Sequence, residues 1–134
     1  MIVVDTNVIA CLYLTGEYSD LSERLLEHDP HWMAPGLWRS EFRNVLALYL
    51  RKELIGLQDS LEILEEAERL MSDSEFEVPS AQVMKLAGES GCSAYDCEFI
   101  ALAQYFRVPL ATNDNTLLQA FPDTAQSVQS IMNS

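Results

Sequence analysis

The sequence contains no apolar run that approaches the ~20 residues needed to cross a bilayer. Met1 leads directly into an apolar segment without a preceding basic stretch, so we expect no signal peptide. Cysteine is scarce and odd in number, and Cys11, Cys92 and Cys97 lack the spacing of a metal finger. We therefore expect a cytoplasmic protein with reduced cysteines and no membrane association.

Basic residues are also scarce. Eight Lys and Arg stand against 21 Asp and Glu, which gives a net charge of −13. An acidic protein repels phosphate, so composition alone disfavours nucleic acid as a partner. The acids are unevenly distributed, however, because seven fall within the sixteen residues Glu62–Glu77 against Arg69 alone. This run is most simply a solvated helix face and the loop after it, and it can lie far from any functional site.

The order of apolar and amphipathic segments predicts the fold. Strands are expected near residues 2–4, 31–34, 76–78, 108–112 and 125–128. Helices are expected near residues 6–14, 19–27, 37–52, 58–71, 80–88, 93–106 and 114–121. This alternation predicts a single α/β domain over residues 1–134. We expect three layers, α/β/α, around a central, mostly parallel sheet of about four to five strands.

The first strand ends on a carboxylate. Ile2-Val3-Val4 is followed at once by Asp5, then by Thr6-Asn7 and the expected first helix. A buried strand that delivers an acid at its carboxyl end and continues into a helix is how open α/β sheets build sites. The question that follows is whether the rest of the chain brings other carboxylates to Asp5.

Three further acids stand at the head of the apolar face of an expected helix: Glu41, Asp96 and Asp114. Apolar residues follow Asp96 and Asp114 at three, four and seven positions, which is the spacing of one helical face. Taken singly, these acids have simpler explanations, as helix caps or, for Glu41, as an ion-pair partner of Arg39 or Arg43. Four acids placed where an element enters the core favour a shared site.

Converging carboxylates need compensation. Two of them about 5 Å apart, at an effective dielectric near 20, repel by roughly 3 kcal/mol. Protonation or a bound divalent metal would relieve this repulsion. Ligands that are all oxygen favour Mg²⁺ or Mn²⁺ over zinc.

Three segments resemble the PIN domain, and in particular the VapC-type toxins of toxin–antitoxin pairs: Ile2–Asn7, Ser93–Ala103 and Pro109–Leu118. Glu41, within Ser40–Leu46, matches the glutamate that this family carries near the start of a long helix. The resemblance implies a metal-dependent ribonuclease whose catalytic acids are Asp5, Glu41, Asp96 and Asp114. It also implies supporting polar residues at Thr6, Asn7 and Thr112, a small cognate antitoxin as partner, and a homodimer.

On this resemblance we expect an endoribonuclease that hydrolyses RNA phosphodiester bonds with Mg²⁺ or Mn²⁺. Asp5 and Asp96 would be the central metal ligands, and Asp114 would complete the metal site or hold a second ion. Glu41 would position the attacking water or act as general base. Arg39 and Arg43 flank Glu41 and are candidates for RNA contact, although ordinary ion-pair arginines fit the pattern equally well.

Two other functions remain open. A phosphatase-type hydrolase would use Asp5 as nucleophile, but that chemistry wants a second acid two residues on, where Asn7 stands. A catalytically weak or silent PIN-like module would instead bind a basic partner peptide in its acidic pocket. Such a module would hold its partner without metal and would turn over no RNA.

Overall fold

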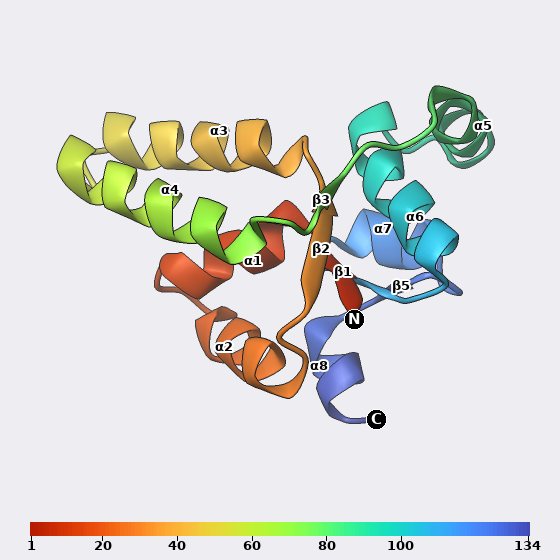
Figure 1. Cartoon of the computed structure of the whole chain (residues 1–134), viewed down its shortest axis with the longest axis horizontal. Coiled ribbons are helices and arrows are strands. Elements are labelled where there is room, and N and C mark those ends of the chain that lie inside the picture. Colours follow the sequence, from red (N-terminus) through yellow and green to blue (C-terminus); the bar gives the residue numbers. More distant parts are fainter.

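A computed structural model describes all 134 residues, which form eight helices around a five-stranded sheet (Figure 1). The strands are β1 (Ile2–Val4), β2 (Trp32–Pro35), β3 (Glu75–Phe76), β4 (Leu110–Ala111) and β5 (Ala125–Gln126). All neighbouring strands are parallel, in the order β3-β2-β1-β4-β5. The first strand of the chain is therefore the central strand of the sheet.

Helices cover both faces of this sheet, which Figure 1 shows edge-on. On the left lie α1 (Thr6–Tyr13), α2 (Ser19–His28), α3 (Trp38–Arg51) and α4 (Leu57–Met71). On the right lie α5 (Ser80–Ser90), α6 (Ala94–Phe106) and α7 (Asn115–Ala120), and α8 (Val128–Met132) ends the chain beside α2. This arrangement confirms the predicted three-layer α/β/α fold. No helix has the length and apolar character of a membrane span.

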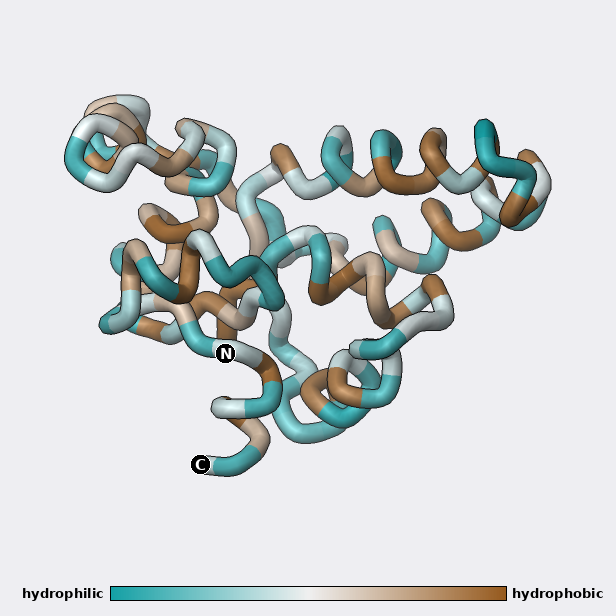
Figure 2. The backbone as a smooth tube through the Cα atoms, turned by 180° about the vertical axis from the view of Figure 1, so that it is seen from behind, coloured by the Kyte–Doolittle hydropathy of each residue, from teal (hydrophilic) through white to brown (hydrophobic).

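The core lies between the sheet and its two helical layers. Every residue of β1 is buried, because a parallel sheet is covered on both faces. On one side α6 buries a continuous apolar stripe against β1, β2 and β4, and on the other α3 buries Trp38 and Phe42. Hydrophobic and hydrophilic segments alternate along α3 and α4 in Figure 2, as expected for helices with one buried face.

The predicted elements are present with small shifts of their ends, except at the carboxyl terminus. The predicted strand 125–128 is wrong in its second half, because β5 ends at Gln126. Val128–Met132 form α8, a helix that we did not predict. Its N-cap is Ser127, whose hydroxyl accepts the Ser130 N–H at 3.1 Å. The capping bond and the burial of Val128 outweigh the weak strand pattern.

The predicted strand 108–112 is also shorter in the structure, where β4 covers Leu110–Ala111. Pro109 has no N–H to donate to a neighbouring strand, but its carbonyl accepts the Val3 N–H at 3.2 Å. Regular pairing with β1 begins at the next residue, where Leu110 stands opposite Val3. Proline is thus tolerated immediately before an inner strand.

Candidate active site

The order of the strands in the sheet reverses at the central strand β1. This strand pairs with β2 on one side and with β4 on the other, so the chain runs outward in opposite directions from it. Such a reversal of strand order is the topological switch point at which open α/β sheets bind ligands. Asp5 directly follows β1, and Thr112 directly follows β4. Asp5, the first of the candidate site residues, therefore lies at the position where open α/β sheets commonly bind ligands.

Asp5 is held by three donors. It is 6% exposed and caps α1, with its Oδ1 accepting the Thr6 N–H at 2.8 Å. Its Oδ2 accepts the Thr112 hydroxyl at 2.7 Å and the Asn7 side-chain amide at 3.3 Å. Asp5 is thus a helix cap, as one of the simpler explanations predicted, but Oδ2 is tied to a residue 107 positions away. Capping alone does not account for this second set of contacts.

Thr112 and Asn7 connect Asp5 to the segment that carries Asp114. The fully buried Thr112 hydroxyl accepts the Asp114 N–H at 3.0 Å while it donates to Asp5. Asn7 Oδ1 accepts the Asn113 N–H at 3.2 Å. The side-chain Nδ2 of Asn113 is buried without any protein partner. These bonds fix the spacing of the two aspartates across the β1–β4 boundary.

Glu41 reaches the same region from the first turn of α3. Its Oε1 accepts the Thr6 hydroxyl at 2.7 Å, so Thr6 contacts both Asp5 and Glu41. The alternative in which Glu41 pairs with a neighbouring arginine is wrong. Arg39 instead binds Glu75 and Glu68, and Arg43 is exposed and makes no ion pair.

Asp96 and Asp114 stand at the starts of α6 and α7. The Ser93 hydroxyl caps α6 and accepts the Asp96 N–H at 3.0 Å. Asp114 caps α7, and its Oδ1 accepts the Thr116 N–H at 2.8 Å. The simpler explanation of a helix cap is confirmed for Asp114, whereas the cap of α6 is Ser93 and not Asp96. Asp114 Oδ2 takes no part in the cap.

The electrostatics indicate that these carboxylates lie near one another. Burial is the main reason why the pKa of Asp5 rises from 3.8 to about 6. The hydrogen bonds that Asp5 accepts from Thr112 and Thr6 lower this pKa, whereas the negative charges of Glu41 and Asp96 raise it further. Burial also raises the pKa of Glu41, with the charge of Asp96 acting in the same direction. For Asp96, burial and the charge of Asp114 raise the pKa. The pKa values of Asp5, Glu41 and Asp96 are therefore each raised by the charge of at least one of the other candidate acids.

The site fits a hard divalent cation but does not enclose one. No three His, Cys, Asp or Glu side chains are grouped closely enough to hold a metal ion by themselves. Mg²⁺ does not require such a cage, because it keeps several waters and usually binds through one or two carboxylates. The oxygen donors and the raised pKa of Asp5 fit a site that lacks a positive charge. Among Asp5, Asp96 and Asp114, one or two would bind the ion directly and the rest would reach it through its waters.

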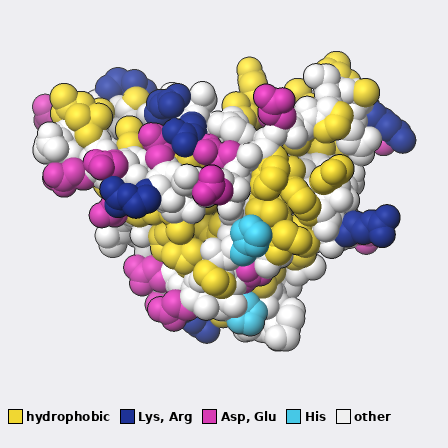
Figure 3. Space-filling view, in the orientation of Figure 1, with side chains coloured by type: hydrophobic (Ala, Val, Ile, Leu, Met, Phe, Trp, Pro, Cys, Tyr) yellow, Lys and Arg dark blue, Asp and Glu magenta, His cyan; other side chains and the backbone are white.

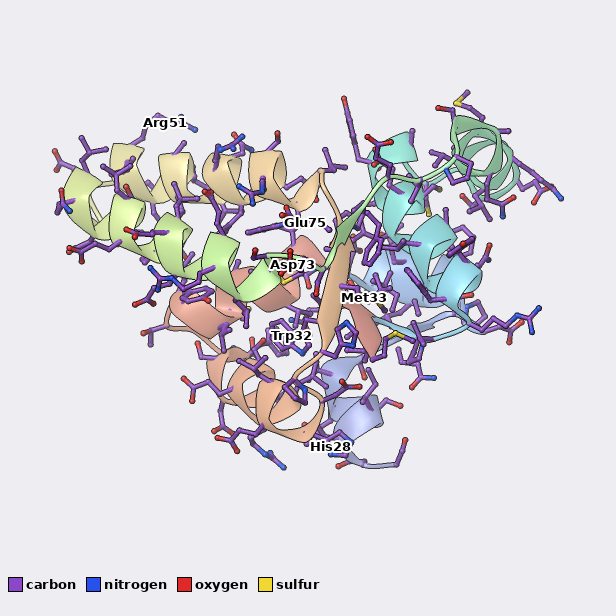
Figure 4. All side chains as sticks on the ribbon, in the orientation of Figure 1. His28, Trp32, Met33, Arg51, Asp73 and Glu75 are labelled. Carbon is purple, nitrogen blue, oxygen red and sulfur yellow. The ribbon has the colours of Figure 1, made fainter.

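The two candidate RNA-binding arginines differ in their contacts. Arg39 donates from Nε and Nη2 to the two carboxylate oxygens of Glu75, at 2.7 and 2.9 Å, and its Nη1 lies 3.0 Å from Glu68. Glu75 also accepts the Trp38 indole N–H at 2.7 Å. Figure 4 shows Glu75 where the inner ends of α3 and α4 approach β3. Arg39 thus joins these elements together, whereas Arg43 is free to meet a ligand.

One acid near this site was missed at the sequence level. Glu98 lies on α6 two residues after Asp96, and its charge also raises the pKa of Glu41. It lines a groove of about 620 Å³ that runs from the start of α3 to α5 and α6. Figure 3 shows hydrophobic side chains gathered between the side of the molecule that carries α3 and the side that carries α5 and α6. The signal available in the sequence was the spacing Asp96-Cys97-Glu98 at a helix start, which we treated as a single acid.

Comparison with known proteins gives consistent results. Residues 2–121 match the PIN domain family. The chain is 31% identical over 126 residues to a protein described as Ribonuclease VapC3 from Pyrobaculum aerophilum, covering 90% of this chain and 95% of that protein.

Three solved structures share the fold at under 25% identity. PAE2754 from Pyrobaculum aerophilum has a TM-score of 0.78 at 19% identity, covering 98% of this chain and 86% of that one. FitAcB from Neisseria gonorrhoeae has a TM-score of 0.71 at 19% identity, covering 96% and 99%. VapC20 from Mycobacterium tuberculosis, described as a toxin that cleaves the sarcin-ricin loop, has a TM-score of 0.62 at 18% identity, covering 86% and 91%.

Proposed function

Because this chain belongs to the PIN domain family, we propose that it is a metal-dependent endoribonuclease of the VapC toxin type. The observation that carries the proposal is the approach of Asp5, Glu41, Asp96 and Asp114, from four separate elements, to the switch point of the sheet. The relative in Pyrobaculum aerophilum, described as a ribonuclease, supports the reaction class.

The four acids take different parts in this proposal. A bound Mg²⁺ or Mn²⁺ would lower the pKa of a coordinated water and neutralise charge on the RNA phosphodiester. Asp5 and Asp96 would hold the ion, and Asp114 would complete the site. Glu41 orients the attacking water and accepts its proton at Oε2, because Oε1 is already bonded to Thr6. A carboxylate whose pKa is raised by burial is a better proton acceptor than an exposed one.

Three polar residues support these acids. Thr6 holds Glu41 through its hydroxyl and Asp5 through its N–H. Thr112 and Asn7 hold Asp5 Oδ2. A metal site requires its ligands to be oriented in advance, so we propose that these bonds preorganise the carboxylates.

RNA binding in this protein depends little on a basic surface. With a net charge of −13, the chain offers few cations to phosphate. Arg43 is exposed two residues from Glu41, and we propose that it contacts a substrate phosphate. Arg39 is not carried forward in this role, since its guanidinium already binds two glutamates. Affinity for RNA then rests on the metal and on the shape of the site.

We further propose the partners that a VapC toxin requires. These are a small cognate antitoxin that silences the enzyme, and a second copy of the chain in a homodimer. The relationship to a VapC ribonuclease supports the antitoxin partner, and the homodimer is proposed from the family resemblance. We also propose that the protein acts in the cytoplasm, where it would meet an RNA substrate and such an antitoxin.

A silent module that binds a basic peptide is the second candidate. It is favoured by the acidic groove beside the site, whose lining contains no Lys or Arg. The phosphatase alternative is weaker, because Asn7 donates an N–H to Asp5 and cannot exchange a proton as an acid would.

The test is cleavage of total RNA by the purified chain, with the new ends mapped. We expect cleavage with Mg²⁺ or Mn²⁺, none in EDTA, and none with the Asp96→Asn variant. Undiminished cleavage in EDTA or by Asp96→Asn would overturn the metal mechanism. Tight binding of a basic partner without metal, together with no cleavage of any RNA, would favour the silent module.

A further inference from the structure

A groove lies beside the four-acid site, along the same edge of the sheet. Its apolar lining comes from β3, from the loops after β2 and β3 and from α5 and α6: Leu37, Phe76, Val78, Val83, Met84 and Ala94. Its volume of about 620 Å³ falls within the ~300–1,000 Å³ typical of small-molecule sites. The groove is large enough for a nucleoside.

Glu98 is the partly buried carboxylate of this groove that has no protein partner, whereas Glu77, the third acid of its lining, is exposed. Its side chain is half-buried, and no donor or cation in the protein contacts its carboxylate. Glu75, by contrast, is fully engaged by Arg39 and Trp38. The Glu98 carboxylate is therefore free to accept N–H groups that a ligand brings to the groove.

The groove is continuous with the site of cleavage. Ala94 and Glu98, which line it, flank Asp96 on α6, and Leu37 lies one turn before Glu41. If the phosphodiester lies at the four acids, the neighbouring nucleotide lies beside this groove. Phosphate is repelled by Glu77 and Glu98 at the groove, and no cation there compensates. The nucleotide therefore turns its base inward and its backbone toward solvent.

We propose, on the basis of the proposed ribonuclease function, that this groove is the subsite for a guanine base next to the cleaved bond, and that Glu98 selects it. A carboxylate accepts two parallel hydrogen bonds through its two oxygens. Among RNA bases, guanine alone presents two adjacent donors, N1–H and N2–H, on its Watson–Crick edge. Single-stranded RNA is read through this edge while the base stacks on apolar or aromatic side chains. Phe76 provides such a surface in the groove.

The experiment measures base preference around the cut. Cleavage of a randomised single-stranded RNA, followed by sequencing of the ends, gives the preferred base at each position. Four RNAs that differ only at the guanine-preferring position then give kcat/KM for each base. We expect wild-type protein to prefer guanine, and Glu98→Gln to lower the guanine-to-adenine ratio about tenfold, the effect of losing one good bidentate base contact.

Glu23→Gln is the matched control, because Glu23 is an exposed acid on α2, away from the groove. It should leave the ratio unchanged. An unchanged ratio in Glu98→Gln, an equal loss on all four RNAs, or the absence of any base preference in wild-type protein would each overturn the guanine subsite. These results leave the ribonuclease proposal standing, because the wild-type protein still cleaves RNA.

A second measurement tests the groove if wild-type protein cleaves nothing, which would contradict the ribonuclease proposal itself. The amide resonances of Phe76, Ala94 and Glu98 are followed in EDTA while the same four RNAs are added. Shifts with the guanine RNA alone support the subsite. Shifts with an arginine-rich peptide but with none of the RNAs would overturn it and assign the groove to a protein partner.

Discussion

Replacing Asp5 by Asn removes the most buried charge of the site and keeps the shape of its side chain. Asp5 is 6% exposed, and burial, together with the charges of Glu41 and Asp96, raises its pKa to about 6. Asn serves as an N-cap about as well as Asp, so α1 retains its cap. The substitution therefore isolates the effect of the charge on stability.

The magnitude follows from the pKa of Asp5 in the two states. Between its ordinary pKa of 3.8 and its folded pKa of about 6, the folded protein keeps a proton that the unfolded chain has released. The free energy of unfolding of the metal-free protein therefore falls as the pH rises through this window, and it stays low above it. The difference of about 2.2 pKa units corresponds to roughly 3 kcal/mol. Asn cannot ionise, so Asp5→Asn does not suffer this loss.

The assay is urea unfolding of wild-type and variant protein in EDTA at pH 4 and pH 8. The stability of Asp5→Asn relative to wild type should rise by roughly 2.4 kcal/mol from the lower to the higher pH, because more than half of the unfolded-state carboxyl is already ionised at pH 4. Asp123→Asn changes an exposed aspartate and should shift stability by under about 0.5 kcal/mol at either pH. The reasoning is refuted if the relative stability of Asp5→Asn is the same at both pH values, or falls as the pH rises.

Three further substitutions test individual contacts. Thr112→Val removes the buried hydroxyl bonded to Asp5 and should lower the free energy of unfolding by about 1–3 kcal/mol; an unchanged urea midpoint would contradict this. Arg39→Ala leaves two acids without their cation and should lower the free energy of unfolding, measured in urea, by about 2 kcal/mol. Arg43→Ala should lower it by under about 0.5 kcal/mol but should raise KM for RNA. Equal stability losses in these two variants would be inconsistent with the contacts. Thr6→Val removes the hydroxyl that binds Glu41, so it should lower kcat about tenfold with little change in KM. Steady-state kinetics of RNA cleavage measure both constants, and a change confined to KM would rule out a positioning role for Thr6.

The local features of the fold could be predicted because each depends on neighbouring residues. The alternation of strands and helices follows from short-range periodicity, and the caps at Asp5, Ser93 and Asp114 follow from residue type at a helix start. The same periodicity placed Glu41 and Asp96 on inward faces. The convergence of these acids was an inference from four such placements, each of which had a simpler explanation.

The contacts that hold the site depend on tertiary structure and could not be read from local pattern. Thr6 and Glu41 are 35 positions apart, and their bond requires α3 to cross the carboxyl end of β1. The pairing of β3 with β2 brings Glu75 beside α3, where it binds Arg39. Local sequence pattern does not reveal this pairing, so Arg39 remained a candidate for RNA contact at the level of sequence. The end of β5 was misplaced because one capping serine decided between strand and helix.

Nuclear magnetic resonance of the protein titrated with Mn²⁺ tests the central claim most directly, because the paramagnetic ion broadens the resonances of residues around it. The account predicts that the amides of Asp5, Glu41, Asp96 and Asp114 broaden together at substoichiometric Mn²⁺, and that Asp96→Asn abolishes the effect. The acidic face of α4, including Glu62 and Glu65, serves as the internal comparison. Broadening confined to α4, or unchanged in Asp96→Asn, would contradict a divalent-metal centre at the carboxyl end of β1.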